Sequence, residues 1–175
     1  PDPFGFRPVA ESLLDAGVTL LTPTAYLENH AAPWALDGLR GGRLVYPRPA
    51  DDRLAWIAAR DVAAALVAAL VRDVDGELLA LAGPHVLTFD QLAAEIGRGL
   101  GRDVAFTRID PGAYGELVRP VLGDEAAAGV AGAYAGMPEG PNPAMAPDAG
   151  PSWDRLGLSP TPASAWAREV LAPLL

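Results

Sequence analysis

The 175-residue chain contains neither cysteine nor lysine, and all 13 of its basic residues are arginine. Without cysteine it has no disulfide, no thiolate nucleophile and no cysteine ligand for zinc. Without lysine it forms no Schiff base and lacks the lysine of a phosphate-binding loop. The lack of cysteine fits a reducing compartment, so we expect a cytoplasmic protein.

Clustered positive charge and long apolar segments are also missing. The net charge is −9, whereas nucleic-acid binding requires clustered cations that displace counterions from the phosphates. The most apolar stretch, residues 62–71, is shorter than the roughly 18 residues of a membrane-spanning helix. We therefore expect no nucleic-acid partner and no membrane partner.

Several catalytic motifs are absent as well. His30 and His85 lie far apart without a matched carboxylate spacing, which disfavours a metal site. No serine stands in a G-x-S-x-G motif, which disfavours a serine hydrolase. No G-x-G-x-x-G is present, so the chain lacks the turn that binds the diphosphate of a dinucleotide. The first residue is Pro1 rather than methionine, and we expect a further segment upstream of it.

The residues that are present alternate between helical patterns and short apolar strands. Residues 7–16 form a predicted helix with Gly17 at its end. Residues 18–22 follow as a β-branched, apolar strand of the kind that is covered on both faces in a parallel sheet. This order predicts an α/β fold.

The middle of the chain is less regular. Glycine and proline between Gly38 and Pro49 predict a loop, and Asp51 and Asp52 after it predict a solvated turn. Residues 54–58 then predict a strand, and Asp61 is expected to cap a helix over residues 62–72.

The rest of the chain contains clearer signals. Thr88 and Gln91 form a capping box that opens a helix ending near Leu100. The further expectations are strands over residues 77–81 and 104–109, one or two helices over 114–134, a connector over 136–151, and a last helix from Thr161 to Leu171.

Four ordered segments carry a resemblance to a known family. They are the stretch LLTPTAYLEN at 20–29, AWIAARDVA at 55–63, LAGPHVLT at 81–88, and residues 156–166. In this order they resemble the second half of NmrA-like proteins, which are atypical short-chain dehydrogenases/reductases of the NAD(P)-binding Rossmann superfamily. The chain departs from ordinary members of that superfamily because it has no tyrosine/lysine pair.

The resemblance implies a fold and a division of the chain. We expect the C-terminal part of a Rossmann-like doubly wound sheet together with the small α/β substrate-binding region, without the glycine-rich N-terminal half. Residues 1–32 would form the last helix and strand of the sheet and the loop near the cofactor. Residues 33–175 would form the substrate-binding region, with sheet elements interleaved.

The resemblance also implies a site in the loop after the first strand. Thr22, Pro23 and Thr24 would lie beside the nicotinamide, and Tyr26, Glu28, Asn29 and His30 would line the substrate cavity. Ligands of open α/β sheets bind outside the carboxyl ends of the strands, which gives the same location. Tyr26 is the phenol nearest that loop in the sequence and is the candidate catalytic residue.

Structural roles compete with these functional ones. The threonines and proline can simply end a strand, and Tyr26 and Asn29 can pack in a helical turn on the core. Glu28 early in a helix is stabilised by the helix dipole whatever else it does.

The function implied by the resemblance is NAD(P)H-dependent reduction of a quinone, ketone or similar small carbonyl compound. NADP or NAD would bind through the upstream half, and we expect no dinucleotide affinity from the 175 residues alone. The alternatives are a non-catalytic NAD(P) sensor or small-molecule-binding regulator, and a cofactor-free cyclase or isomerase. Besides a small-molecule substrate, we expect the missing half or a second copy of the chain as a partner, since the first strand would otherwise expose a bare edge.

Overall fold

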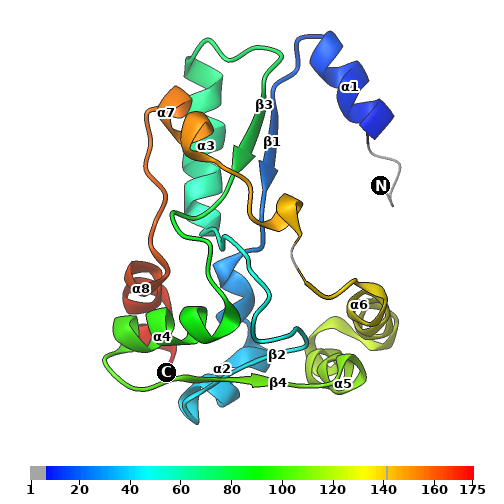
Figure 1. The fold of residues 1–175 in the computed structure, drawn as a ribbon, viewed down its shortest axis with the longest axis vertical. Helices are drawn as coiled ribbons and strands as arrows, with labels where there is room; N and C mark the ends of the chain where they lie inside the picture. The colour runs from blue at the N-terminus through cyan, green and yellow to red at the C-terminus, as the bar shows by residue number, and fades with distance from the viewer. Residues whose placement is uncertain (1–6, 141) are drawn as a thin grey trace.

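The computed structural model describes residues 7–140 and 142–175. The first six residues of the predicted sheet portion, residues 1–32, lie outside the described residues. Figure 1 shows an elongated α/β molecule with two regions, each built on a pair of parallel strands. The upper region contains the strands β1 and β3, and the lower region contains β2 and β4.

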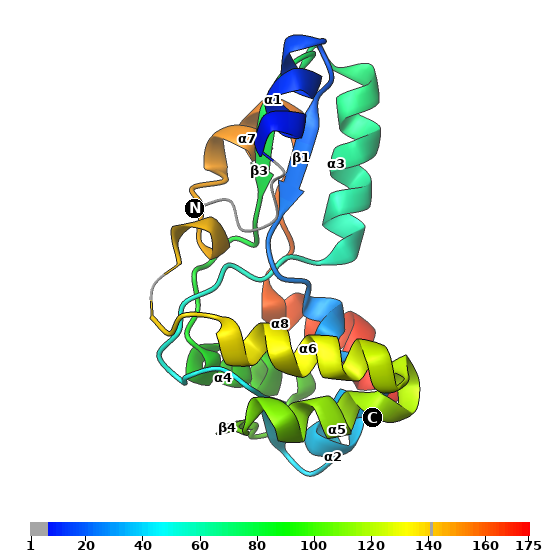
Figure 2. The same cartoon turned by 90° about the vertical axis from the view of Figure 1, so that its right-hand side faces the viewer.

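The upper region is thin. Strand β1 (Leu20–Pro23) pairs in parallel with β3 (Leu78–Leu81). Between them the chain passes through the lower region and returns along α3 (Ala59–Val71), which leads into β3. Figure 2 shows the strand pair edge-on, with α3 along one face and the short α7 (Gly150–Leu156) beside the other. Helix α1 (Arg7–Asp15) contacts β1 but has no buried residue.

The lower region is more thickly covered. Strand β2 (Arg43–Tyr46) pairs in parallel with β4 (Ala105–Arg108), and helices surround the pair. They are α2 (Pro33–Arg40), α4 (Phe89–Leu100), α5 (Pro111–Leu122), α6 (Asp124–Gly136), α8 (Ala163–Trp166) and a π-helical continuation, η3 (Ala167–Leu171). Short 3₁₀ turns are η1 (Leu27–His30), η2 (Pro143–Met145) and η4 (Ala172–Leu174).

Helix α4 forms as its capping box predicts. The Thr88 hydroxyl accepts from the Gln91 backbone N–H at 3.2 Å, and the Gln91 side chain accepts from the Thr88 N–H at 2.9 Å. A left-handed Gly101 ends the helix at φ +67°. Its buried face includes Phe89, Leu92 and Ile96, which belong to the core of the lower region.

The predicted loop between Gly38 and Pro49 is wrong, because it contains the end of α2 and all of β2. A Cβ on Gly38 would lie 3.0 Å from the Arg43 carbonyl, so this glycine lets the helix pack closely on the strand. Gly42 has φ +71° and turns the chain between them. The glycines therefore serve a tight helix-to-strand connection instead of an irregular loop.

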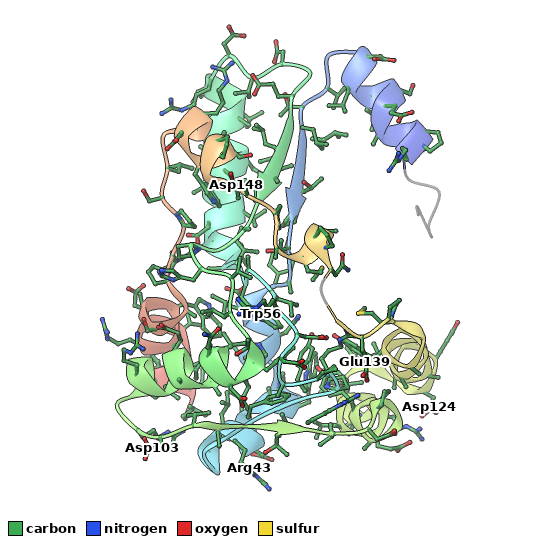
Figure 3. All side chains as sticks on the ribbon, viewed as in Figure 1. Arg43, Trp56, Asp103, Asp124, Glu139 and Asp148 are labelled. Carbon is green, nitrogen blue, oxygen red and sulfur yellow. The ribbon has the colours of Figure 1, made fainter. Side chains whose placement is uncertain are left out.

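The predicted strand over residues 54–58 is also wrong. Its N–H groups bind three different segments: Leu54 donates to the Leu87 carbonyl, Ala55 to Met145 and Ile57 to Ala25. No single neighbouring strand accepts the whole run, so only isolated bridges form. The segment is nonetheless buried and joins the two regions at Trp56 (Figure 3).

Asp61 does not cap α3 as expected. The helix begins at Ala59, and the carboxylate that accepts from its first N–H, at 2.9 Å, belongs to Glu28. Asp61 instead accepts from the N–H and the hydroxyl of Thr161, at 2.7 and 2.8 Å. This aspartate therefore fixes the chain that leads into α8.

The expected burial of the first strand on both faces is wrong as well. Thr22 and Pro23 of β1 are exposed, and β1 and β3 each pair with one strand only within the described residues. No described helix is long and apolar enough to cross a membrane.

Candidate functional site

A cavity of about 160 Å³ lies where the carboxyl ends of β1 and β2 meet. Ala25 and Asn29 reach it just after β1, Tyr46 is the last residue of β2, and Arg48 follows that strand. The remaining lining residues are Asp52, Arg53, Leu54, Tyr134, Met137, Gly140, Asn142 and Met145. The cavity therefore occupies the position at which ligands bind to open parallel sheets.

Larger hollows exist elsewhere on the surface. One of about 660 Å³ lies beside the end of α4 and the turn into β4, but its charged side chains Arg98, Arg102 and Asp103 are exposed. The smaller cavity brings together buried polar groups, and this makes it the candidate site.

Two tyrosine hydroxyls form the polar part of the cavity wall. The Tyr46 and Tyr134 oxygens lie 2.5 Å apart, a hydrogen-bond distance, although β2 and α6 are far apart in the sequence. Tyr114 of α5 packs against both rings with centroid distances of 5.4 and 5.5 Å, and its side chain does not line the cavity. Three of the four tyrosines of the chain thus meet in one aromatic cluster.

Burial keeps these phenols protonated. It raises the pKa of Tyr46 well above the ordinary value, and the neighbouring Tyr134 and Tyr114 raise it further. The pKa of Tyr114 rises to about 12, and burial also raises the pKa of Tyr134. Each hydroxyl near the cavity therefore has a proton to donate at neutral pH.

A buried ion pair closes another part of the wall. Arg48 Nε donates to Asp52 Oδ2 at 2.6 Å, and the guanidinium also donates to the carbonyls of Met137 and Pro138 at 3.1 and 2.8 Å. The other oxygen of Asp52 accepts from the Gly140 N–H at 3.0 Å. The pair thereby holds the connector after α6 against the cavity, and the solvated turn expected at Asp52 is wrong because this residue is 3% exposed.

The predicted site residues are dispersed around this cavity. Asn29 lines it together with Tyr46. His30 is buried behind the wall, with its ring 4.7 Å from that of Trp56 and 5.7 Å from that of Tyr46. Burial lowers the pKa of His30 to about 3, so its imidazole is neutral. Its Nε2 has no hydrogen-bond partner within the described residues.

The other predicted residues lie nearer the upper region. Thr22 and Pro23 are exposed at the end of β1, and the buried Thr24 donates its hydroxyl to the Ala55 carbonyl. Tyr26 packs against the core of the upper region and is not among the cavity-lining residues. Both carboxylate oxygens of Glu28 are bound, one to the Ala59 N–H and the other to the Trp166 indole at 3.0 Å.

Sequence reasoning did not find Tyr46, Arg48, Asp52 or Tyr134 as cavity residues. The glycines and prolines around β2 predict a loop, so the sequence does not indicate that Tyr46 ends a strand. The weak helical pattern around Tyr134 does not indicate which part of the molecule this tyrosine faces. The one available signal was the Arg48/Asp52 spacing, since opposite charges four residues apart beside two prolines can pair.

Two glycines beside the strands do not offer a cradle for the diphosphate of a dinucleotide. The glycine that follows β3, Gly83, lies against protein: a Cβ there would come 1.9 Å from the Trp56 carbonyl oxygen. A Cβ on Gly42 would come 3.4 Å from the Asp103 carbonyl. Neither of these two glycines provides open space for a phosphate.

Sequence comparison relates the chain to a reductase and to a dehydrogenase. No protein-family model matches it. It is 32% identical over 102 residues to the (4-alkanoyl-5-oxo-2,5-dihydrofuran-3-yl)methyl phosphate reductase of Streptomyces griseus, covering 57% of this chain and 36% of that protein. It is 27% identical over 109 residues to agroclavine dehydrogenase of Claviceps purpurea, covering 61% and 38% of the two chains. The chain thus spans little more than a third of these relatives.

Comparison with solved structures extends over nearly the whole chain. An NADPH-dependent quinone oxidoreductase from Escherichia coli superposes with a TM-score of 0.68 and 23% identity, covering 94% of this chain and 60% of that one. The chain has the fold of part of a Rossmann-like reductase. It shares this α/β architecture, with its parallel strands and adjoining helices, and it spans about three fifths of that structure's length.

Proposed function

We propose that this chain is the substrate-side portion of an NmrA-like, NAD(P)H-dependent oxidoreductase that reduces a quinone, ketone or similar small carbonyl compound. The observation that carries the proposal is the cavity at the carboxyl ends of β1 and β2, whose wall presents two protonated phenols and a neutralised ion pair. Such a wall suits an uncharged ligand with an oxygen atom that accepts a hydrogen bond from a phenol. The two sequence relatives are a reductase and a dehydrogenase, which supports the oxidoreductase class.

In this proposal the two regions have different tasks. The exposed end of β1 at Thr22 and Pro23 faces the nicotinamide, and the segment from Tyr26 to His30 separates that edge from the substrate. The cofactor, NADP or NAD, supplies the hydride and binds mainly through residues outside this chain. Tyr26 stays a candidate proton donor, and residues 1–32 and 33–175 stay the proposed division between sheet and substrate region.

The test uses the intact protein together with the 175-residue chain. We expect the intact protein to oxidise NADPH or NADH in the presence of a one-ring quinone or an aryl ketone, measured by the loss of absorbance of the reduced cofactor. The chain alone is expected to show neither turnover nor micromolar cofactor affinity. Discrimination between NADPH and NADP⁺ by the intact protein without turnover of any quinone or ketone would favour the sensor instead. Conversion of a substrate without cofactor would favour the cyclase or isomerase.

A further inference from the structure

We infer that the cavity binds one neutral ring bearing a carbonyl or quinone oxygen, and that the Tyr46–Tyr134 hydroxyl pair donates the hydrogen bond that orients this oxygen. The inference deepens the proposed function and rests on it for the class of ligand. The site itself is argued from the size of the cavity, its charge and its hydrogen-bonding groups.

The size of the cavity limits the ligand to one ring. Its volume of about 160 Å³ is close to that of an engineered apolar cavity of about 150 Å³ that accommodates benzene. Leu54, Met137 and Met145 supply apolar contacts to such a ring. A fused bicyclic ligand would have to place its second ring outside this volume, where the wall contacts it less.

The charge of the wall selects a neutral ligand. Arg48 and Asp52 are both buried, and their charges compensate each other within the wall. The remaining guanidinium contacts go to the Met137 and Pro138 carbonyls, so Arg48 is held in place by the protein itself. Arg53 also belongs to the lining, but its side chain is exposed, where water screens its charge.

One of the two phenolic protons is not used in the hydrogen bond between Tyr46 and Tyr134. Each phenol is both a donor and an acceptor, and the 2.5 Å contact between Tyr46 and Tyr134 consumes only one O–H. When Tyr46 donates to Tyr134, the Tyr134 proton is left for a ligand. A ligand oxygen in the cavity completes this chain of donors. Because burial raises the pKa of both phenols, the arrangement persists through neutral pH.

The decisive experiment compares two probes of nearly equal shape. Acetophenone carries the carbonyl oxygen and ethylbenzene does not, and both are titrated into the 175-residue chain and followed by NMR chemical shifts. The ratio of the two dissociation constants isolates the hydrogen bond from ring burial. We expect this ratio to change three- to tenfold against acetophenone in Tyr134→Phe, the value of roughly one neutral hydrogen bond. Tyr46→Phe keeps the donating Tyr134 hydroxyl and should change the ratio by less, since it only removes the group that orients this donor.

Two controls make the result specific. Tyr114→Phe removes a hydroxyl from the same aromatic cluster without altering the lining, so its ratio should match that of the unmodified chain. 2-Acetonaphthone, with two fused rings, should bind at least tenfold more weakly than acetophenone. An unchanged ratio in both phenol variants, or equal binding of the two ketones, would overturn the inference. Should a variant unfold, the other phenol variant and the two-ketone comparison still decide the matter.

A failure of the ligand site and a failure of the proposed oxidoreductase activity would give different experimental results. Binding that depends on the phenols in a protein without cofactor-dependent turnover supports the site and contradicts the oxidoreductase. Quinone or ketone reduction that persists in both phenol variants with unchanged KM and kcat supports the oxidoreductase and contradicts the site.

Discussion

The lower region encloses its core, whereas the upper region leaves apolar surface uncovered. Around β2 and β4, Trp166, Phe89 and Ile96 are fully buried beneath helices. Around β1 and β3, α1 buries nothing and α3 buries only Asp61 and Ala65 of its thirteen residues. The difference indicates that the lower region can supply its own stability and that the upper region needs more covering.

The uncovered surface is concentrated on α3. Leu66 and Leu70, and likewise Val67 and Val71, lie four residues apart and form an apolar stripe away from the strands, with Leu70 85% exposed. A helix that is apolar on both faces belongs in the interior of a layered α/β sheet.

The largest effect is expected in the enclosed region. Trp166→Ala should lower the free energy of unfolding by about 3–5 kcal/mol, because it removes a fully buried indole and the donor to Glu28. Urea denaturation followed by circular dichroism measures this change. Val121→Ala, on the exposed side of α5, should change the same quantity by about 0.5 kcal/mol or less. A cost below 1 kcal/mol for Trp166→Ala would mean that the lower core is not the stable part.

The next effect concerns the ion pair in the cavity wall. Asp52→Ala leaves the Arg48 guanidinium buried without its counter-charge and should cost about 3 kcal/mol, again measured by urea denaturation. The exposed pair of Asp37 and Arg40 is the matched control, and Asp37→Ala should cost less than about 1 kcal/mol. Equal costs would show that the burial of the wall pair has no energetic consequence.

His30 predicts a pH dependence of the enclosed region. Burial lowers its folded pKa to about 3, below the unfolded value near 6.5, so the unfolded chain takes up the proton first as the pH falls. Stability is therefore complete above pH 6.5 and declines below it, by about 2 kcal/mol between pH 6.5 and 5. His30→Leu should flatten this decline, while His85→Gln, at an exposed position, should keep it. A decline that persists in His30→Leu would assign it to other groups.

The elements of the fold with local signals were predictable from the sequence. The capping box of α4, the strand at Leu78–Leu81 and the helix opened by Pro162 all appear where their residues place them. Strand β2 was not predictable, since the glycines around it also fit a loop and only the packing of Gly38 on Val45 distinguishes the two. The apolar pattern of residues 54–58 predicts a strand, because it does not reveal that the backbone hydrogen bonds of this segment go to three different partners.

The candidate site was predictable in location and only partly in composition. The rule that ligands lie beyond the carboxyl ends of parallel strands led to the loop after β1, and Asn29 of that loop lines the cavity. Tyr134 approaches from a helix 88 residues away from Tyr46, and such a long-range contact leaves no trace in a single sequence.

The smallest change in stability is expected on the uncovered stripe, and it bears most directly on the comparison. Val67→Glu combined with Leu70→Glu should alter the unfolding free energy of the chain by about 0.5 kcal/mol or less, since both side chains already face solvent. The same pair should reduce concentration-dependent self-association in sedimentation velocity, because it removes an apolar patch that associates in water. Leu117→Glu with Val121→Glu, a matched exposed pair on α5, should leave association unchanged. A loss of several kcal/mol in the α3 variant would instead place the stripe within the chain's own core, and the two regions would then differ less than their exposed surfaces indicate.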